Sequence, residues 1–123
     1  MQIPKQYLPV MPYIIVKDAS AFVQFLQNVY GATEQLNVPG EDGKLMHGEY
    51  RIGDAVIMCA NAHEQWAEKT SGMYLYVEDV KGVYELAINN GAESIMPPGQ
   101  KEYGFTAGFN DPFGNQWWIV EGE

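Results

Sequence analysis

Hydrophobic residues along this chain follow one pattern twice, a short apolar run and then a helical rhythm. Residues 13–16 form the first run, and residues 74–77 form the second, 61 positions later. After each run the apolar residues recur every three or four positions, which predicts an amphipathic helix; they are Ala21, Phe22, Phe25, Leu26 and Val29, and then Val80, Val83, Tyr84 and Ala87. The chain is therefore predicted to contain an internal repeat.

Polar residues and glycines mark where each helix begins and ends. Asp18 and Asp79 stand where a helix needs an N-cap, and Gly31 and Gly91 stand where a left-handed residue ends a helix. Short extended runs follow each helix and are separated by turn residues, such as those at 39–43 and 111–114. Each repeat is thus predicted to have the order βαβββ.

Two such modules predict an α+β fold with helices covering one face of a sheet. Module one covers about residues 9–61 and module two about residues 71–121. Together they are expected to form a curved, cup-shaped mixed sheet with the helices on the outer face. A ferredoxin-like domain has the order βαββαβ, and the three extended runs after each helix disfavour it.

The length and composition fit one domain that buries an ordinary core. The chain has 123 residues, of which 46% are hydrophobic, so we expect a single domain over residues 1–123. No apolar run reaches the length of a membrane span, and residues 1–7 lack the basic-then-apolar order of a signal peptide. We therefore expect a cytoplasmic protein with no membrane partner.

The chain is acidic, with a net charge of −9 from 16 acidic and 7 basic residues. This charge opposes binding to the phosphates of nucleic acids and to anionic membranes. It would attract a cationic ligand, although the solubility of the surface alone also accounts for it. The single Cys59 is expected to be a small core residue with no chemical role.

Two segments resemble a known superfamily. Residues 46–58 read MHGEYRIGDAVIM and residues 111–120 read DPFGNQWWIV. Both are similar to the vicinal-oxygen-chelate superfamily of glyoxalases, bleomycin-resistance proteins and dioxygenases, and in particular to its PhnB-like, glyoxalase-like subgroup. With the repeated strand-helix openings, the likeness covers residues 10–120. The superfamily includes isomerases, dioxygenases, antibiotic-modifying enzymes and drug-binding proteins, so the resemblance implies a fold rather than a reaction.

The resemblance also locates the positions at which metal-dependent members carry ligands. Those members place a His or Glu on the first and last strand of each module, and the four positions here hold Met11, Met58, Gly72 and Trp118. A thioether binds only soft metals, and Gly and Trp offer no side-chain lone pair. We therefore expect no metal and no cofactor, which disfavours glyoxalase and extradiol dioxygenase chemistry.

The turn Gly53-Asp54 predicts the two faces of the hairpin around it. Glycine at the first central position suits a type II′ turn, which places Glu49 opposite Met58. Alternate side chains share a face, and the family position of Met58 lies inside the cup. His47 and Glu49 are therefore predicted to point into the cup.

The same alternation lines the cup with aromatic and sulfur-containing side chains. Trp117 is expected to join the core under the helices, whereas Tyr103 lies in a predicted loop over residues 97–104 at the mouth of the cup. Such a lining favours flat or cationic molecules. The predicted ligand contacts are Met11, Tyr13, His47, Glu49, Met58, Tyr74, Tyr76, Tyr103 and Trp118.

Three functional hypotheses remain open. The first is a metal-free homodimer that binds a small, partly aromatic or cationic organic molecule, as drug-binding members of the superfamily do. The second is a glyoxalase-like lyase or isomerase, or a dioxygenase-type enzyme, with His47 as the general acid or base and Glu49 orienting it, with or without a metal. The third is a cup filled by its own side chains, in place of a cavity of several hundred cubic ångströms.

The polar stretch 61–69 links the two modules. We expect it to be a solvated loop or a short helix. His63 and Glu64 approach the cup only if this linker folds over it.

Overall fold

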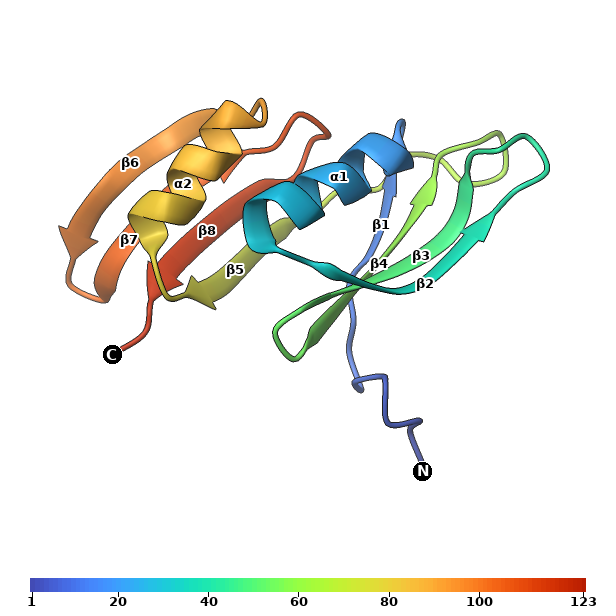
Figure 1. The fold of residues 1–123 in the computed structure, drawn as a ribbon, viewed down its shortest axis with the longest axis horizontal. Coiled ribbons are helices and arrows are strands. Elements are labelled where there is room, and N and C mark those ends of the chain that lie inside the picture. Colours follow the sequence, from blue (N-terminus) through green and yellow to red (C-terminus); the bar gives the residue numbers. More distant parts are fainter. The chain divides into compact units, whose positions relative to one another are not determined.

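The computed structural model describes residues 1–123 and contains two four-stranded mixed sheets, each with one helix across one of its faces (Figure 1). The chain divides into two compact units, residues 1–69 and residues 70–123. Each unit has the order βαβββ, which confirms the α+β fold and the repeat predicted from the sequence. No helix in the chain is both long and apolar enough to cross a lipid bilayer.

The two units have the same topology. In the first, the strands lie in the order β1-β4-β3-β2, with β1 parallel to β4 and the other pairs antiparallel. In the second they lie in the equivalent order β5-β8-β7-β6. The elements are β1 (Tyr13–Val16), α1 (Ala19–Tyr30), β2 (Thr33–Pro39), β3 (Leu45–Ile52) and β4 (Ala55–Asn61), then β5 (Gly72–Val77), α2 (Val80–Asn89), β6 (Glu93–Lys101), β7 (Gly104–Asn110) and β8 (Gln116–Glu121).

Two side chains cap the first turn of α1. The Asp18 carboxylate accepts a hydrogen bond from the Ala21 N–H at 3.1 Å, as an N-cap residue does. The Asn61 side-chain oxygen, at the end of β4, accepts one from the Ala19 N–H at 2.9 Å. At the other end, Gly31 has a φ of 65° and closes α1 in the left-handed region that glycine adopts without strain.

The second unit repeats both caps. Asp79 accepts a hydrogen bond from the Gly82 N–H at 3.0 Å, and Glu121, at the end of β8, accepts one from the Val80 N–H at 2.9 Å. Glu121 occupies the position that Asn61 has in the first unit. The repeat therefore extends from the backbone to the side-chain contacts that start each helix.

Alternate side chains of each sheet pack under its helix and form the core. Ile14, Val16, Tyr50 and Cys59 are each 2% exposed or less, and Trp117 in the second unit is 1% exposed. The positions of Cys59 and Trp117 in the core are as predicted. The face of each sheet opposite its helix is called its open face below.

The hairpin between β3 and β4 turns at Gly53 and Asp54. Gly53 has a φ of 57°, and no residue other than glycine has a positive φ, so the turn is of type II′ rather than type I′. The register is the predicted one, with Glu49 paired to Met58. Because alternate residues share a face, His47 lies on the open face with Glu49 and Met58.

Prolines account for two differences from the predicted strands. Strand β1 begins at Tyr13, so Met11 lies before it rather than in it, because the intervening Pro12 has no N–H to extend the ladder. Residues 97–101, predicted to lie in a loop, belong to β6, since an edge strand tolerates the missing N–H of proline. Only Glu102 and Tyr103 form the turn to β7.

Two β-bulges interrupt the pairing of β2 with β3. Gln35 is an extra residue on β2, next to the pair of Leu36 and Glu49, and Met46 is an extra residue on β3, next to His47. A bulge removes the following side chains from the strict alternation of a strand. Both bulges lie beside residues of the open face.

Candidate functional site

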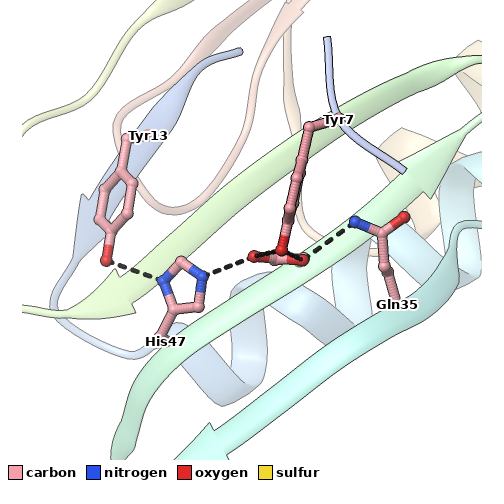
Figure 2. A network of polar contacts seen from close by, with 5 residues as sticks. Tyr7, Tyr13, Gln35 and His47 are labelled. Carbon is pink, nitrogen blue, oxygen red and sulfur yellow. Dashed lines mark hydrogen bonds and ion pairs between the residues drawn. The ribbon is translucent and has the colours of Figure 1, made fainter. Parts of the chain in front are cut away.

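A chain of hydrogen bonds crosses the open face of the first unit (Figure 2). The Tyr13 hydroxyl lies 3.0 Å from Nδ1 of His47, and Nε2 of His47 lies 2.8 Å from Oε2 of Glu49. Tyr13 comes from β1, whereas His47 and Glu49 are alternate residues of β3. The structure thus brings together three of the predicted ligand contacts.

The Glu49 side chain is buried and surrounded by hydrogen-bond donors. Only 2% of the residue is exposed; the Tyr7 hydroxyl lies 3.0 Å from both carboxylate oxygens, and the Gln35 amide donates at 2.9 Å. Burial acts to raise the pKa of Glu49, but the hydrogen bonds from Gln35, His47 and Tyr7 together lower this pKa below its ordinary value. Glu49 is therefore an ionised carboxylate at neutral pH.

The Glu49 carboxylate determines which nitrogen of His47 carries the proton. An ionised carboxylate only accepts hydrogen bonds, so Nε2 of a neutral His47 donates to it and Nδ1 accepts from the Tyr13 hydroxyl. Burial above all raises the pKa of Tyr13, so the phenol retains its proton. A hydroxyl, an imidazole and a carboxylate linked in this order can move a proton along the chain.

The segment before β1 lies against the same face. The Arg51 guanidinium donates to the Gln35 side-chain oxygen at 2.8 Å and to the Gln6 carbonyl at 3.2 Å. The hydrogen bond to Glu49 is the main cause that raises the pKa of Tyr7, because this bond needs the phenolic proton. Gln6 and Tyr7 thereby hold the N-terminal segment over the buried carboxylate.

A pocket of about 420 Å³ opens beside Tyr13. This volume lies within the range of small-molecule sites. The first unit therefore keeps an open cavity, which argues against a site filled by its own side chains. The pocket is lined by Tyr13, Ile15, Met46, Ala60, His63 and Trp66.

The linker supplies part of the pocket wall. His63 and Trp66 exchange two backbone hydrogen bonds of 3.0 and 3.1 Å, and Lys69 pairs with Ile15 of β1 through two bonds of 2.9 Å. Nδ1 of His63 accepts from the Gln65 N–H at 3.1 Å, so a neutral ring carries its proton on Nε2. The linker, predicted to be a solvated loop or a short helix, is a folded loop that brings His63 to the pocket.

Three of the predicted contacts from the second unit, Tyr74, Tyr76 and Trp118, lie on its open face, and the fourth, Tyr103, lies in the turn between β6 and β7. Tyr74 and Tyr76 are 54% and 68% exposed, and their ring centroids lie 6.0 Å apart. Partial burial, then the phenols of Tyr76 and Tyr103, raise the pKa of Tyr74. Trp118 pairs with Tyr74 on one side and with Gly108 on the other.

The residues present do not fit a metal at the four family positions. Gly72 has no side chain, the Trp118 indole offers no lone pair, and Met11 and Met58 supply only thioethers. His47 is no replacement, since both of its ring nitrogens are already hydrogen-bonded. The structure contains no group of three or more His, Cys, Asp or Glu side chains that could hold a metal ion.

Sequence reasoning missed four residues of this site. Gln35 and Met46 lie at bulges, which depend on the pairing of two strands and leave no local signal. Tyr7 and Trp66 lie outside helices and strands, in the N-terminal segment and the linker. An aromatic residue in the otherwise polar linker was the one signal that favoured Trp66.

Comparisons of sequence identify relatives over most of the chain. A family model described as Glyoxalase/Bleomycin resistance protein/Dioxygenase superfamily matches residues 7–119. Uncharacterized proteins of Mycobacterium bovis and Mycobacterium tuberculosis are each 30% identical over 118 residues. These matches cover 86% of this chain, with 78% of the M. bovis protein and 69% of the M. tuberculosis protein.

Solved structures share the fold at low sequence identity. The PhnB protein of Bacillus cereus has a TM-score of 0.77 at 14% identity, over 94% of this chain and 100% of that chain. TioX of Micromonospora sp. ML1 has a TM-score of 0.74 at 19% identity, over 91% of this chain and 98% of that chain. The fosfomycin resistance protein FosX of Mesorhizobium loti has a TM-score of 0.67 at 16% identity, over 93% of this chain and 90% of that chain. At identities this low, the likeness shows a common fold alone.

Proposed function

We propose that this chain, which belongs to the Glyoxalase/Bleomycin resistance protein/Dioxygenase superfamily, binds a small organic molecule without a metal in the pocket of its first unit. The open pocket of about 420 Å³ is the observation that supports this function most directly. Its rings, from Tyr13, His63 and Trp66, favour a flat aromatic molecule. Through Tyr13, the pocket also meets the polar pair of His47 and Glu49.

The charge around the pocket favours a cationic molecule. A second hollow shares Met46 and His63 with the pocket. It is also lined by Glu41 and Asp42, against a single lysine, Lys44, and no arginine. The net charge of the whole chain is −9. The negative charge of the protein would attract an aromatic cation, and contact with the face of the Trp66 ring would stabilise the bound cation.

The proposal includes the remaining predicted contacts. Met58 lies on the open face between Tyr13 and Glu49, its partners on the two neighbouring strands. Met11 is proposed as a further contact in the first unit. Ligand contacts are also proposed on the second unit by itself, at Tyr74, Tyr76, Tyr103 and Trp118.

Calorimetric titration tests this function with two flat probes of opposite charge. We expect proflavine, an aromatic cation, to bind with a Kd on the order of micromolar, and naphthalene-1-sulfonate, an aromatic anion, to bind more weakly. Trp66→Ala should weaken proflavine binding at least about tenfold, since aromatic anchors dominate such sites. Gln65→Ala is the matched control in the same loop and should leave the affinity unchanged. Absence of binding by both probes, or full affinity in Trp66→Ala, contradicts the proposal.

A homodimer is also proposed for this chain. Strands β2 and β6 are sheet edges with unpaired backbone groups, and a second copy would cover such edges. Sedimentation velocity at micromolar concentration tests this proposal, and a monomer at that concentration contradicts the homodimer.

Proton transfer through His47 and Glu49 is the second candidate function, in the manner of a glyoxalase-like lyase or isomerase. The hydrogen-bonded order of Tyr13, His47 and Glu49 favours it. Its test is the exchange of carbon-bound hydrogen of dihydroxyacetone with D₂O, followed by NMR. His47→Gln and Glu49→Gln should abolish an exchange that the unaltered protein catalyses, whereas no exchange by that protein contradicts this function.

A further inference from the structure

We infer that Tyr13 is the residue that contacts the bound molecule and receives its proton, while His47 and Glu49 act through Tyr13 as positioning residues. The inference rests on the proposed function of the first-unit pocket, and it specifies a class of ligand. That class is a flat aromatic molecule that donates an O–H, such as a phenol.

Access to the hydrogen-bonded chain supports Tyr13 rather than His47. Both ring nitrogens of His47 are occupied, Nδ1 by Tyr13 at 3.0 Å and Nε2 by Glu49 at 2.8 Å. Glu49 is 2% exposed, whereas Tyr13 is 47% exposed and lines the pocket. Of the three residues in the hydrogen-bonded chain, only Tyr13 lines the pocket, so a molecule bound there meets the chain at Tyr13.

The direction of the hydrogen bonds makes the Tyr13 oxygen an acceptor toward the pocket. Glu49 is held as a carboxylate by its donors Tyr7, Gln35 and His47. His47 then donates from Nε2, and its Nδ1 takes the hydrogen of the Tyr13 hydroxyl. The lone pairs of the Tyr13 oxygen then remain free to accept a hydrogen bond from an O–H of the ligand.

Each proton in the transfer has a defined destination. The ligand O–H bond breaks and its proton passes to the Tyr13 oxygen, while the original Tyr13 proton passes to Nδ1 of His47. The ligand keeps the bonding electron pair as an oxyanion, and His47 becomes an imidazolium beside the Glu49 carboxylate. No oxidant or further reactant takes part, and the ion pair of His47 and Glu49 stabilises the charge that forms.

Nitrogen NMR of the ligand-free protein tests the direction of the chain. We expect the neutral His47 ring to carry its proton on Nε2, with a shifted Nδ1 resonance in Tyr13→Phe, which removes the donor. Tyr84→Phe, on α2 in the second unit, is the control and should leave the His47 resonances unchanged. A proton found on Nδ1 of the neutral ring overturns the inference.

A titration with p-nitrophenol tests the acceptor role, because its ionised form absorbs visible light. At a slightly acidic pH we expect the ratio of ionised to neutral p-nitrophenol to be about tenfold higher in the bound than in the free molecule, which is one pKa unit. Tyr13→Phe and His47→Gln should lose this gain in ionisation when they are saturated with p-nitrophenol, at whatever affinity each variant binds it; tryptophan fluorescence measures the saturation. Tyr84→Phe should retain the gain.

The remaining outcomes separate this inference from the proposed function. If p-nitrophenol binds without a gain in ionisation, or keeps the gain in Tyr13→Phe, the inference is overturned while the pocket stands as a binding site. If proflavine binds and p-nitrophenol does not, the inference is likewise overturned and the pocket likewise stands as a binding site. If neither probe binds, both the proposed function and the inference fail.

Discussion

The indole ring of Trp118 lies against the backbone of Gly108, its partner on β7. A Cβ atom at Gly108 would overlap the six-membered ring of this indole. We expect Gly108→Ala to displace the ring and to lower the free energy of unfolding by about 1–3 kcal/mol, as overpacking does. Urea denaturation measures this, with Gly72→Ala as the control, since a Cβ there meets no atom within 4 Å. Unchanged stability in Gly108→Ala would show that the ring is not held against the sheet.

Trp117 and Trp118 are neighbours on β8 with different predicted phenotypes. Trp117 is 1% exposed, and its ring N–H donates to the Asp111 carboxylate at 2.9 Å. Trp117→Ala should lower the free energy of unfolding by about 3–5 kcal/mol, because it leaves a large cavity. Trp118→Ala should lower the free energy of unfolding by less, because this side chain lies on the open face of the second unit. A greater loss of stability in Trp118→Ala than in Trp117→Ala would refute the assignment of the two faces.

Glu49 should make the stability of the protein depend on acidic pH. Its pKa is lower in the folded protein than its ordinary value, so the unfolded chain binds this proton more tightly. The stabilisation that Glu49 contributes is then complete above the pKa that Glu49 has in the unfolded chain. It is lost as pH falls through the pKa that Glu49 has in the folded protein. Urea denaturation between about pH 7 and pH 3 should therefore show that the free energy of unfolding falls less steeply with pH in Glu49→Gln than in the unaltered protein. Glu64→Gln, at an exposed linker residue, is the control, and equal declines for both variants would contradict the prediction.

Cys59 should be chemically inert in the folded protein. Burial raises the pKa of this thiol to about 12, and the side chain is 0% exposed. Because the thiolate is the reactive form, Ellman's reagent should modify the folded protein at least about a hundredfold more slowly than the urea-unfolded chain. Rapid, stoichiometric modification under native conditions would mean that the first unit opens readily.

Features that depend on local pattern could be predicted from the sequence. The helical rhythm and the caps at Asp18 and Asp79 indicated both helices, and the Gly53 turn indicated the register of Glu49 with Met58. Each of these features is encoded within a few neighbouring residues, by periodicity or by turn chemistry. Turn chemistry and strand alternation placed Glu49 on the same face of the sheet as Met58, and the resemblance to the superfamily then indicated which face that was.

Features that depend on pairing between distant residues could not be predicted in this way. The second unit has the equivalent bulge, with Ile95 as its extra residue and Gly108 close by, where the first unit has Gln35 and Glu49. The backbone irregularity is thus repeated, but only the first unit has polar side chains there. The repeat alone therefore gave no indication that the hydrogen-bonded chain belongs to one unit.

The caps that link the last strand of each unit to its helix also bear on how the chain is made. Asn61 lies 42 residues after Ala19, and Glu121 lies 41 residues after Val80. During synthesis from the N-terminus, the first N–H of each helix has no such partner until the final strand of that unit has left the ribosome. Each βαβββ unit is therefore the smallest nascent segment that can complete its own helix, and the first can do so while the second is still being translated.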